Sequence, residues 1–286
     1  MIKGAWIIEQ LDLGGEVVPV RLVLVSCTFE QDVILLDCTL PELHLKGSQM
    51  PALNDQRLLC EGSLHLRNGF RAIGKVDLLG AKITGQLSRQ GGRFLAKNVA
   101  LNCYAITVGA DVFLRRGFEA RGTINLIWAE IAGDLDRLDA SLTKGFIAQG
   151  MRVGARFLWQ PVKTDGIEVN LLDAHVGTLM DPPESWQPVK RLLLPSFRYD
   201  RIESERDVAE RLDWLAKHDN SVFLFTPQPH LKLANVLRQN GFAAEAARIL
   251  IRREDKQRAA EWERAMDNVG VSLKHELIAF AHQYRH

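Results

Sequence analysis

A stretch of 28 residues recurs once in this chain, and the recurrence limits the folds available to it. Residues 60–87 match residues 108–135 at a constant offset of 48 positions. Apolar residues and glycines that return at a fixed spacing are typical of a stacked solenoid, in which every layer buries equivalent side chains. The repeat therefore indicates an architecture and not a chemistry. The identical pairs include Leu66/Leu114, Phe70/Phe118, Ala72/Ala120, Leu78/Leu126, Ala81/Ala129, Ile83/Ile131 and Leu87/Leu135.

A shorter unit of 10 or 11 residues runs through the same region. In each unit a small residue precedes an apolar residue by two positions, as in Cys27/Phe29, Cys38/Leu40 and Ala129/Ile131. Such a unit holds one or two short strands and cannot bury its own apolar side, so the units must stack. Two units make one coil of roughly 22 residues, about 4.8 Å from the next coil. We predict a right-handed parallel β-helix over residues 1–200, with a loop insertion within residues 88–98.

Prolines interrupt the repeat after residue 180. Proline cannot donate a hydrogen bond to a β-ladder, so we expect residues 181–200 to form an irregular cap. A cap is needed because an open solenoid end exposes unpaired strand edges. The prolines are Pro182, Pro183, Pro188 and Pro195.

From residue 201 to residue 286 the apolar period changes from about two to about 3.6, which indicates an α-helical module. Residues 203–219 have the pattern of one amphipathic helix. Pro229 and Gly241 suit the start and the stop of a second helix. Residues 243–266 suit its partner in a helical hairpin, and residues 271–286 suit a last helix.

Composition excludes several classes of protein. The formal net charge of +1 disfavours both a strongly basic nucleic-acid binder and an acidic DNA mimic. No apolar run approaches the length of a membrane span, and the first residues lack a signal-peptide pattern, so we expect a cytoplasmic chain. The cysteines show no CxxC spacing, which disfavours zinc and a secreted disulfide framework. We interpret them as small apolar residues inside the coils. They are Cys27, Cys38, Cys60 and Cys103.

Two groups of side chains are candidates for chemistry in the sequence. Asp134, Asp136 and Asp139 could place two carboxylates on one strand face, as polysaccharide-cleaving enzymes do. A solvated outer face is the alternative, and we favour it, because strand alternation alone produces such pairs. His275, His282 and His286 have helical spacings that suit a metal, but the chain end makes solvated histidines the preferred interpretation.

A third candidate is a basic stripe in the helical module. Arg248, Arg252 and Lys256 are spaced at i, i+4 and i+8, which could bring them against anionic lipid or a protein partner. Glu254 and Asp255 lie beside them in the sequence, so a solvated helix face is the alternative.

Several segments resemble a known group of proteins. They include GSLHLRNGFRAIGKVDLLGAKITGQL, RLDWLAKH and FTPQPHLKLANVLRQNGFAAEAARILIRRED. These resemble bacterial pentapeptide-like β-helical proteins that carry the name membrane-associated oxidoreductase. The resemblance implies a β-helix followed by helices and, in many members, a membrane segment, which does not occur before His286. No GxGxxG after a strand, CxxC, haem or flavin signature supports the redox activity in that name, so we predict no cofactor.

The sequence favours a non-catalytic β-helical scaffold. We expect it to recruit a protein partner or to dock at the cytoplasmic face of a bacterial inner membrane, without binding nucleic acid. The alternative is an enzyme, either a membrane-associated oxidoreductase or a polymer-acting β-helix enzyme, with its site in a lateral groove. The oligomeric state is not indicated by any pattern in the chain.

Overall fold

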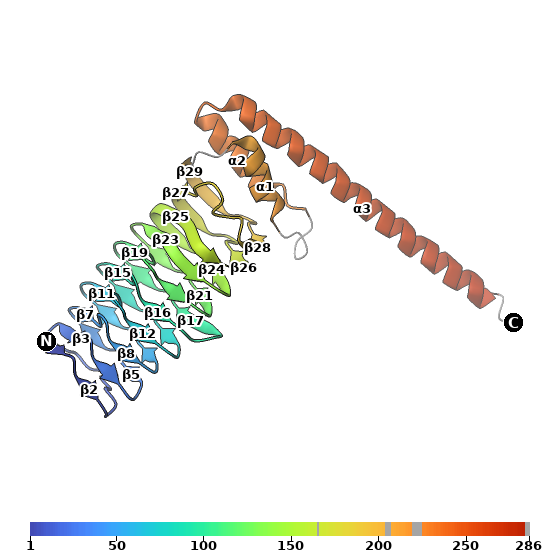
Figure 1. Cartoon of the computed structure of the whole chain (residues 1–286). Helices are drawn as coiled ribbons and strands as arrows, with labels where there is room; N and C mark the ends of the chain where they lie inside the picture. Colours follow the sequence, from blue (N-terminus) through green and yellow to red (C-terminus); the bar gives the residue numbers. More distant parts are fainter. Residues whose placement is uncertain (165, 204–206, 219–224, 284–286) are drawn as a thin grey trace. The chain divides into compact units, whose positions relative to one another are not determined.

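The protein consists of two compact units, Met1–His218 and Asp219–His286. The computed structural model describes residues 1–286 apart from 165, 204–206, 219–224 and 284–286, and the side chains of 161–164 and 267–283 also lie outside the described set. The first unit is a parallel β-solenoid that ends in a short helix, and the second contains two further helices (Figure 1). The predicted order, a parallel β-helix followed by helices, is confirmed.

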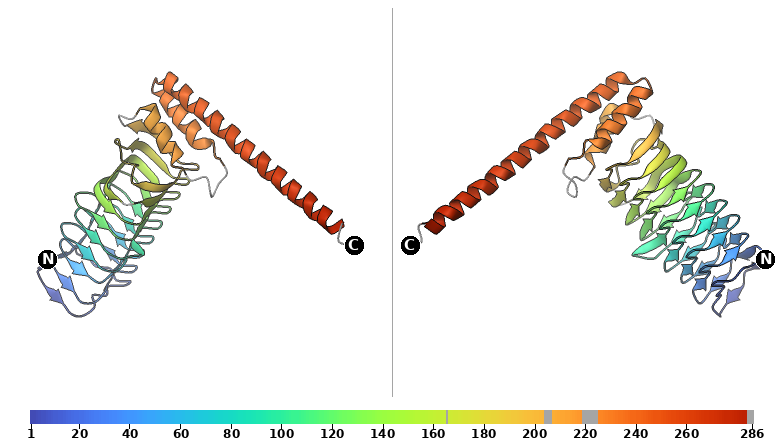
Figure 2. Two further views of the ribbon diagram at one scale, coloured as in Figure 1. Left: turned by 45° about the vertical axis from the view of Figure 1, so that its right-hand side comes forward. Right: turned by 180° about the vertical axis from the view of Figure 1, so that it is seen from behind.

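The coils of the solenoid stack one on another (Figure 2). In its middle part each coil contributes four short strands, so that strands four apart in the chain pair in parallel. We name the resulting faces A to D. Face A is an eight-stranded sheet of β5 (Val33–Ile34), β9 (Leu53–Asn54), β13 (Val76–Asp77), β17 (Val99–Asn102), β21 (Thr123–Asn125), β24 (Gly145–Ile147), β26 (Ile167–Asn170) and β28 (Val189–Leu193).

The other three faces join into one 21-stranded sheet, because the last long strands continue around the corners. Face B contains β6 (Thr39–Leu40), β10 (Leu59–Cys60), β14 (Lys82–Ile83), β18 (Thr107–Val108) and β22 (Glu130–Ile131). Face C contains β1 (Ile2–Lys3), β3 (Leu22–Val25), β7 (Leu43–His44), β11 (Leu64–His65), β15 (Leu87–Ser88) and β19 (Val112–Phe113). Face D contains β2 (Trp6–Ile7), β4 (Thr28–Phe29), β8 (Gln49–Met50), β12 (Arg71–Ala72), β16 (Arg93–Phe94) and β20 (Glu119–Ala120). The long strands are β23 (Leu135–Leu142), β25 (Arg152–Thr164), β27 (His175–Met180) and β29 (Arg198–Glu203).

The strand register gives the length of each coil. On face A, Val33 pairs with Leu53, Leu53 with Val76, and Val76 with Leu101, so successive coils advance by 20, 23 and 25 residues. The longest of these coils contains a register shift between Val99 and Leu101. The insertion predicted for residues 88–98 therefore extends past that range, into the β-bulge between Val99 and Leu101. The 48-residue sequence repeat spans two coils.

Large and small interior side chains alternate from coil to coil, and this explains why the sequence repeats every second coil. On face B the stacked residues are Cys38, Leu58, Ala81, Ile106, Ala129, Met151, Ala174 and Phe197, which we call the apolar column. All eight are buried. A large residue in one coil thus fills the space that its small neighbour leaves, as close packing requires.

The same exchange explains the interior phenylalanines. Phe70 and Phe118 occupy an interior position that holds a small residue in the other coils. The ring of Phe94 lies between their rings, at centroid distances of 5.4 and 5.2 Å. Gly92 is needed there, because a Cβ atom on it would lie 2.8 Å from the Leu66 carbonyl oxygen. The prediction that Phe70 and Phe118 lie inside one β-helix is confirmed.

A column on face C is less uniform. Its stacked residues include two arginines that are fully enclosed in the solenoid. We call it the mixed column, and it contains Leu45, Leu66, Arg89, Leu114, Arg137 and Trp159.

The end of the solenoid differs from the predicted irregular cap. Residues 181–200 contain β28 and begin β29, because the four prolines occupy corners and leave the strands free to pair. Helix α1 (Val208–Ala216) belongs to the same unit and begins with a capping box between Asp207 and Glu210. Its Arg211 donates two hydrogen bonds of 2.6 and 2.8 Å to the carboxylate of Asp181, which is fully buried. Aromatic rings also close this end of the solenoid, and the ring centroids of Trp214 in α1 and Trp186 lie 5.8 Å apart.

The second unit contains α2 (Gln228–Gln239) and α3 (Ala243–Gln283). Helix α2 begins next to Pro229, ends before Gly241 at a φ of +88°, and packs on α3, which confirms the predicted hairpin. The two helices predicted after Gly241 are one continuous helix. Among the described residues, none of the helices combines the length and apolar character needed to cross a membrane.

Candidate functional site

The three aspartates identified in the sequence do not form a pair of free carboxylates. Asp134 and Asp136 lie on the same side of the chain around β23, as predicted, but Asp139 occupies a corner at a φ of +55° and is exposed. The carboxylate of Asp134 lies 2.6 Å from Nη2 of Arg156, and that of Asp136 forms an ion pair with Arg115. Each acid is therefore bound to an arginine of a neighbouring coil.

These ion pairs argue against acid catalysis at the aspartates. Burial raises the pKa of Asp134, but hydrogen bonds from the Arg156 side chain and backbone more than offset this, and the pKa lies below its usual value. A general acid needs the opposite shift, because it must keep its proton near neutral pH. The outer face that we favoured from the sequence fits this geometry, but its acids are ion-paired and Asp136 is buried, which the sequence did not predict.

The basic stripe of α3 is only partly present. Arg248 and Arg252 are exposed, whereas Lys256 is half-buried. Burial and the charge of Arg252 lower the pKa of Lys256. The reason is geometric: residues four apart drift by about 40° around a helix of 3.6 residues per turn, so the third residue turns towards the packed side. The side chains of His275, His282 and His286 lie outside the described residues.

A groove of about 220 Å³ lies on face A, and one of its two acids, Asp77, is ion-paired. Asp77 lines it, 2.6 Å from Nζ of Lys75, and accepts hydrogen bonds from Gln56 at 2.9 Å and Asn102 at 2.7 Å. Asn125 continues this ladder by donating to Asn102 at 3.0 Å. The acid thus stabilises the stacking of polar side chains between coils, which is a structural role.

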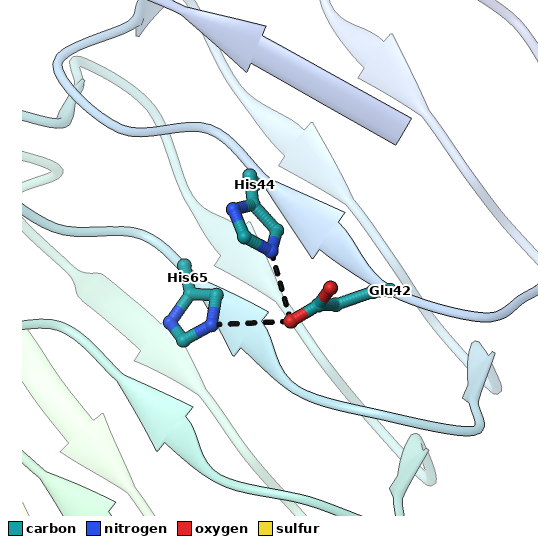
Figure 3. Close-up of side chains that lie close together, drawn as sticks. All are labelled: Glu42, His44 and His65. Atoms are coloured by element: carbon teal, nitrogen blue, oxygen red, sulfur yellow. Dashed lines mark ion pairs between the residues drawn. The ribbon is translucent and has the colours of Figure 1, made fainter. Parts of the chain in front are cut away.

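A further cluster, on face C, was not recognised from the sequence. His44 of β7 and His65 of β11 are register partners in adjacent coils, and Glu42 lies two residues before His44 (Figure 3). Leu43 and Leu64 point into the core and are fully buried. Because side chains alternate along a strand, Glu42, His44 and His65 all point outward from the same face.

The three side chains converge on a small volume. Oε1 of Glu42 lies 2.9 Å from Nε2 of His44 and 3.5 Å from Nε2 of His65 (Figure 3). One ligand atom from each residue lies within 4.8 Å of the other two. The side chains of His44, His65 and Glu42 are 15, 11 and 28% exposed, so that solvent reaches the cluster without surrounding it.

The pKa values of His65 and Glu42 are both lowered in the cluster. Burial, together with the charges of His44 and Arg67, lowers the pKa of His65 to about 4. Burial raises the pKa of Glu42, but His44 and His65 more than offset this, and the pKa lies below its usual value. Nε2 of His44 makes no aligned hydrogen bond despite its short distance to Glu42. At neutral pH the cluster therefore offers a carboxylate and the neutral imidazole of His65.

A signal for this cluster does exist in the sequence. His44 and His65 each follow an inward leucine and are 21 residues apart, which is close to one coil. The spacing becomes a contact only once the coil length is known locally, and it varies from 20 to 26 residues in this solenoid.

The comparisons with known proteins add no family. No protein-family model, no curated protein and no solved structure matches this chain. The resemblance to pentapeptide-like proteins therefore stays a prediction, and the site rests on its geometry alone.

Proposed function

We propose that this protein is a non-enzymatic β-helical scaffold that docks on an anionic membrane surface through α3. The observation that supports this is an exposed row of large apolar side chains on that helix. Ile251, Trp262 and Met266 are 63, 69 and 53% exposed. Large apolar side chains gathered on one surface mark interaction sites more often than scattered ones do.

The row lies on the side of α3 that faces away from α2. Successive helix residues are rotated by about 100°, so Ile251, Trp262 and Met266 lie within about 60° of one another around the axis. Ala246 and Ile249, on the opposite side, are fully buried. Up to residue 260 the helix thus has one packed side and one free side, which carries Ile251, whereas residues 261–266, including Trp262 and Met266, are exposed all around the axis.

Positive charge accompanies the apolar row. Arg248, Arg252 and Arg258 are exposed on or beside this side, together with two acids, Asp255 and Glu263. Tryptophan and arginine are favoured where a helix meets lipid headgroups, and each basic residue near an anionic surface contributes about 1 kcal/mol. Charge complementarity therefore favours a lipid surface over an uncharged partner, with the apolar row as the second contribution that stable attachment needs.

The ion pairs of the outer face favour a scaffold over the enzyme alternative. The acids on face C that an enzyme would use are held by arginines, and Asp77 in the groove is held by Lys75. A polymer-acting enzyme would need one carboxyl group with a raised pKa beside an ionised one.

Vesicle co-sedimentation tests the proposal. We expect the chain to bind anionic vesicles at low salt and to dissociate towards 1 M salt, where the Debye length falls to about 3 Å. Arg248→Glu with Arg252→Glu should abolish binding, and Trp262→Ala should weaken it. Arg238→Glu with Arg264→Glu is the matched control, because both arginines are exposed but lie off this side.

Two outcomes would overturn the membrane proposal. One is equal binding to neutral and anionic vesicles, and the other is unchanged binding of the Arg248→Glu, Arg252→Glu variant. If vesicles are not bound but Trp262→Ala abolishes association with a purified protein partner, α3 is a protein-docking helix and the lipid assignment is wrong.

A further inference from the structure

The cluster on face C has the ligand set of a transition-metal site. Two imidazole nitrogens and one carboxylate oxygen are the donors used by catalytic zinc sites, which keep a fourth position open. The same donors suit other divalent first-row metals, whose affinities follow a common order. The three residues come from two adjacent coils that the Leu43–Leu64 register holds in place, so the ligands are positioned by the solenoid itself.

The distances fit a single central ion. With metal–ligand bonds of about 2.0–2.2 Å, two ligands of a tetrahedral zinc ion lie about 3.4 Å apart. The distances from Glu42 Oε1 to the two Nε2 atoms are 2.9 and 3.5 Å, on either side of this value. All three ligand atoms lie within 4.8 Å of one another, so rotation of the imidazoles about their side-chain bonds is what would bring them to bonding distance of one ion.

A serine of the next coil lies beside His65. The strand neighbour of His65 in the next coil is Ser88. Its side-chain oxygen is buried and has no hydrogen-bond partner. Adjacent strands are about 4.8 Å apart, so this hydroxyl is a polar group one strand beyond His65.

We infer that Glu42, His44 and His65 form a binding site for one divalent transition-metal ion, with zinc as the expected occupant. The ion links two neighbouring coils and carries one exchangeable water. This site is independent of the membrane surface proposed for α3.

The matched control for this site is a histidine–carboxylate pair elsewhere on the solenoid. Nε2 of His175 lies 3.1 Å from Asp200, on β27 and β29. This pair reproduces the contact between one imidazole and one carboxylate, and it lacks the second imidazole. A histidine that binds zinc merely because it is near an acid would therefore behave like His175.

The test is zinc titration of the full chain after treatment with a chelator. We expect calorimetry to show one Zn²⁺ bound per chain. When Co²⁺ replaces zinc, we expect a visible absorption spectrum typical of a metal ion with a low coordination number. His44→Ala and His65→Ala should each weaken binding at least about tenfold, the scale already reached when only outer partners of a metal are lost. His175→Ala should bind as the wild type does. Zinc should also raise the thermal midpoint of the wild type and not that of His65→Ala.

Two results would overturn the site. One is that the wild type takes up no stoichiometric zinc. The other is that both His44→Ala and His65→Ala still take up zinc as the wild type does. Circular dichroism of each variant shows whether it is folded. Should an alanine variant fail to fold, His65→Gln, which keeps a polar side chain of similar reach, takes its place. Vesicle binding should be the same in His65→Ala and wild type, so that failure of one proposal is distinguished from failure of the other.

Discussion

The apolar column of face B and the mixed column of face C are built from the same backbone repeat, yet they accept different chemistry. In the apolar column, Ala81 and Ala129 alternate with residues such as Ile106, and volume alone determines the choice. In the mixed column, Arg89 and Arg137 occupy positions equivalent to Leu66 and Leu114. Both arginines are buried, with 1 and 0% exposure.

The comparison shows that interior positions are selected by volume before polarity. Arg89 lies in the coil whose face A residue is the small Cys103, and its Nη2 is 3.4 Å from the cysteine sulfur. Arg137 stacks on the rings of Phe146 and Trp159 at 4.5 and 3.9 Å. The guanidinium groups thus fill space and contact polarisable groups, which partly replaces the lost hydration.

Asp55 offers the strongest test, because it places a carboxyl group in a small interior position of face A. Burial raises its pKa to about 8, with the charge of Arg89 opposing the shift. The unfolded chain loses this proton near pH 4, whereas the folded protein keeps it to about pH 8. The folded state therefore binds more protons in this window, and stability falls as pH rises through it.

We expect Asp55→Asn to remove this dependence and to raise the free energy of unfolding at pH 8 by about 5 kcal/mol. Urea unfolding at pH 5 and pH 8 measures it. Asp139→Asn, at an exposed corner, is the control and should change stability by less than about 0.5 kcal/mol. Equal pH dependence in wild type and Asp55→Asn would show that the carboxyl is not protonated inside the coil.

Arg211→Leu tests what happens when a buried charge does have a counter-ion. It removes the bidentate partner of the buried Asp181 and should lower the free energy of unfolding by about 3–5 kcal/mol. The double variant with Asp181→Asn should lose less than Arg211→Leu alone, because no charge is then left buried. A double variant as unstable as the single one would mean that packing, and not charge, is the main contribution.

Leu126→Ala tests the volume rule at an apolar position. Leu126 is 2% exposed and lies between the small residues Cys103 and Ala148 of adjacent coils, which cannot fill the cavity. We expect a loss of about 2–5 kcal/mol in the free energy of unfolding. Leu59→Ala is the control, because Leu59 is 40% exposed and should contribute far less. A similar loss in both variants would contradict the volume rule.

Arg137→Leu makes the mixed column resemble the apolar one. Burial lowers the pKa of Arg137 to about 9, which shows that the fold disfavours its charge. Leucine already fills the equivalent position at Leu114, so we expect the free energy of unfolding to rise by about 1–4 kcal/mol, with the lost ring stacking reducing the gain. Chemical denaturation measures this, and a destabilised variant would show that the cation is needed for packing.

The apolar column is also the part of the fold that could be predicted from the sequence. The pairs Ala81/Ile83 and Ala129/Ile131 predicted the inward positions, whereas the alternation of small and large residues from coil to coil became visible only in the structure. Arg137 could not be placed in this way, because a charged residue in an alternating pattern is normally read as outward. The partners of Asp134 and Asp136 come from adjacent coils, and a contact of that kind follows from register and not from local pattern.

The candidate metal site was missed for the same reason. His44 and His65 are individually unremarkable outward residues, and only the register Leu43–Leu64 makes them neighbours. The end of the solenoid shows a related difference. The prolines after residue 180 predicted an irregular cap, yet they lie in corners that proline tolerates, and the closure depends on Trp214 and Arg211 of α1.

The smallest effect is expected at the small positions of the interior. Cys27 and Cys38 are fully buried, free of disulfide, and occupy the small interior positions predicted for them. Burial raises the pKa of Cys38, so its thiol is not poised to react. In the apolar column, Ala81 fills the position two coils beyond Cys38, so the column already accepts alanine.

Cys27→Ala with Cys38→Ala should therefore change the free energy of unfolding by less than about 1.5 kcal/mol, as volume-conserving changes do. Zinc and vesicle binding should also stay at wild-type levels. Mass spectrometry of the wild type should find two free thiols at these positions. An oxidised Cys27–Cys38 pair, or lost zinc binding in the double variant, would show that these cysteines do more than fill volume.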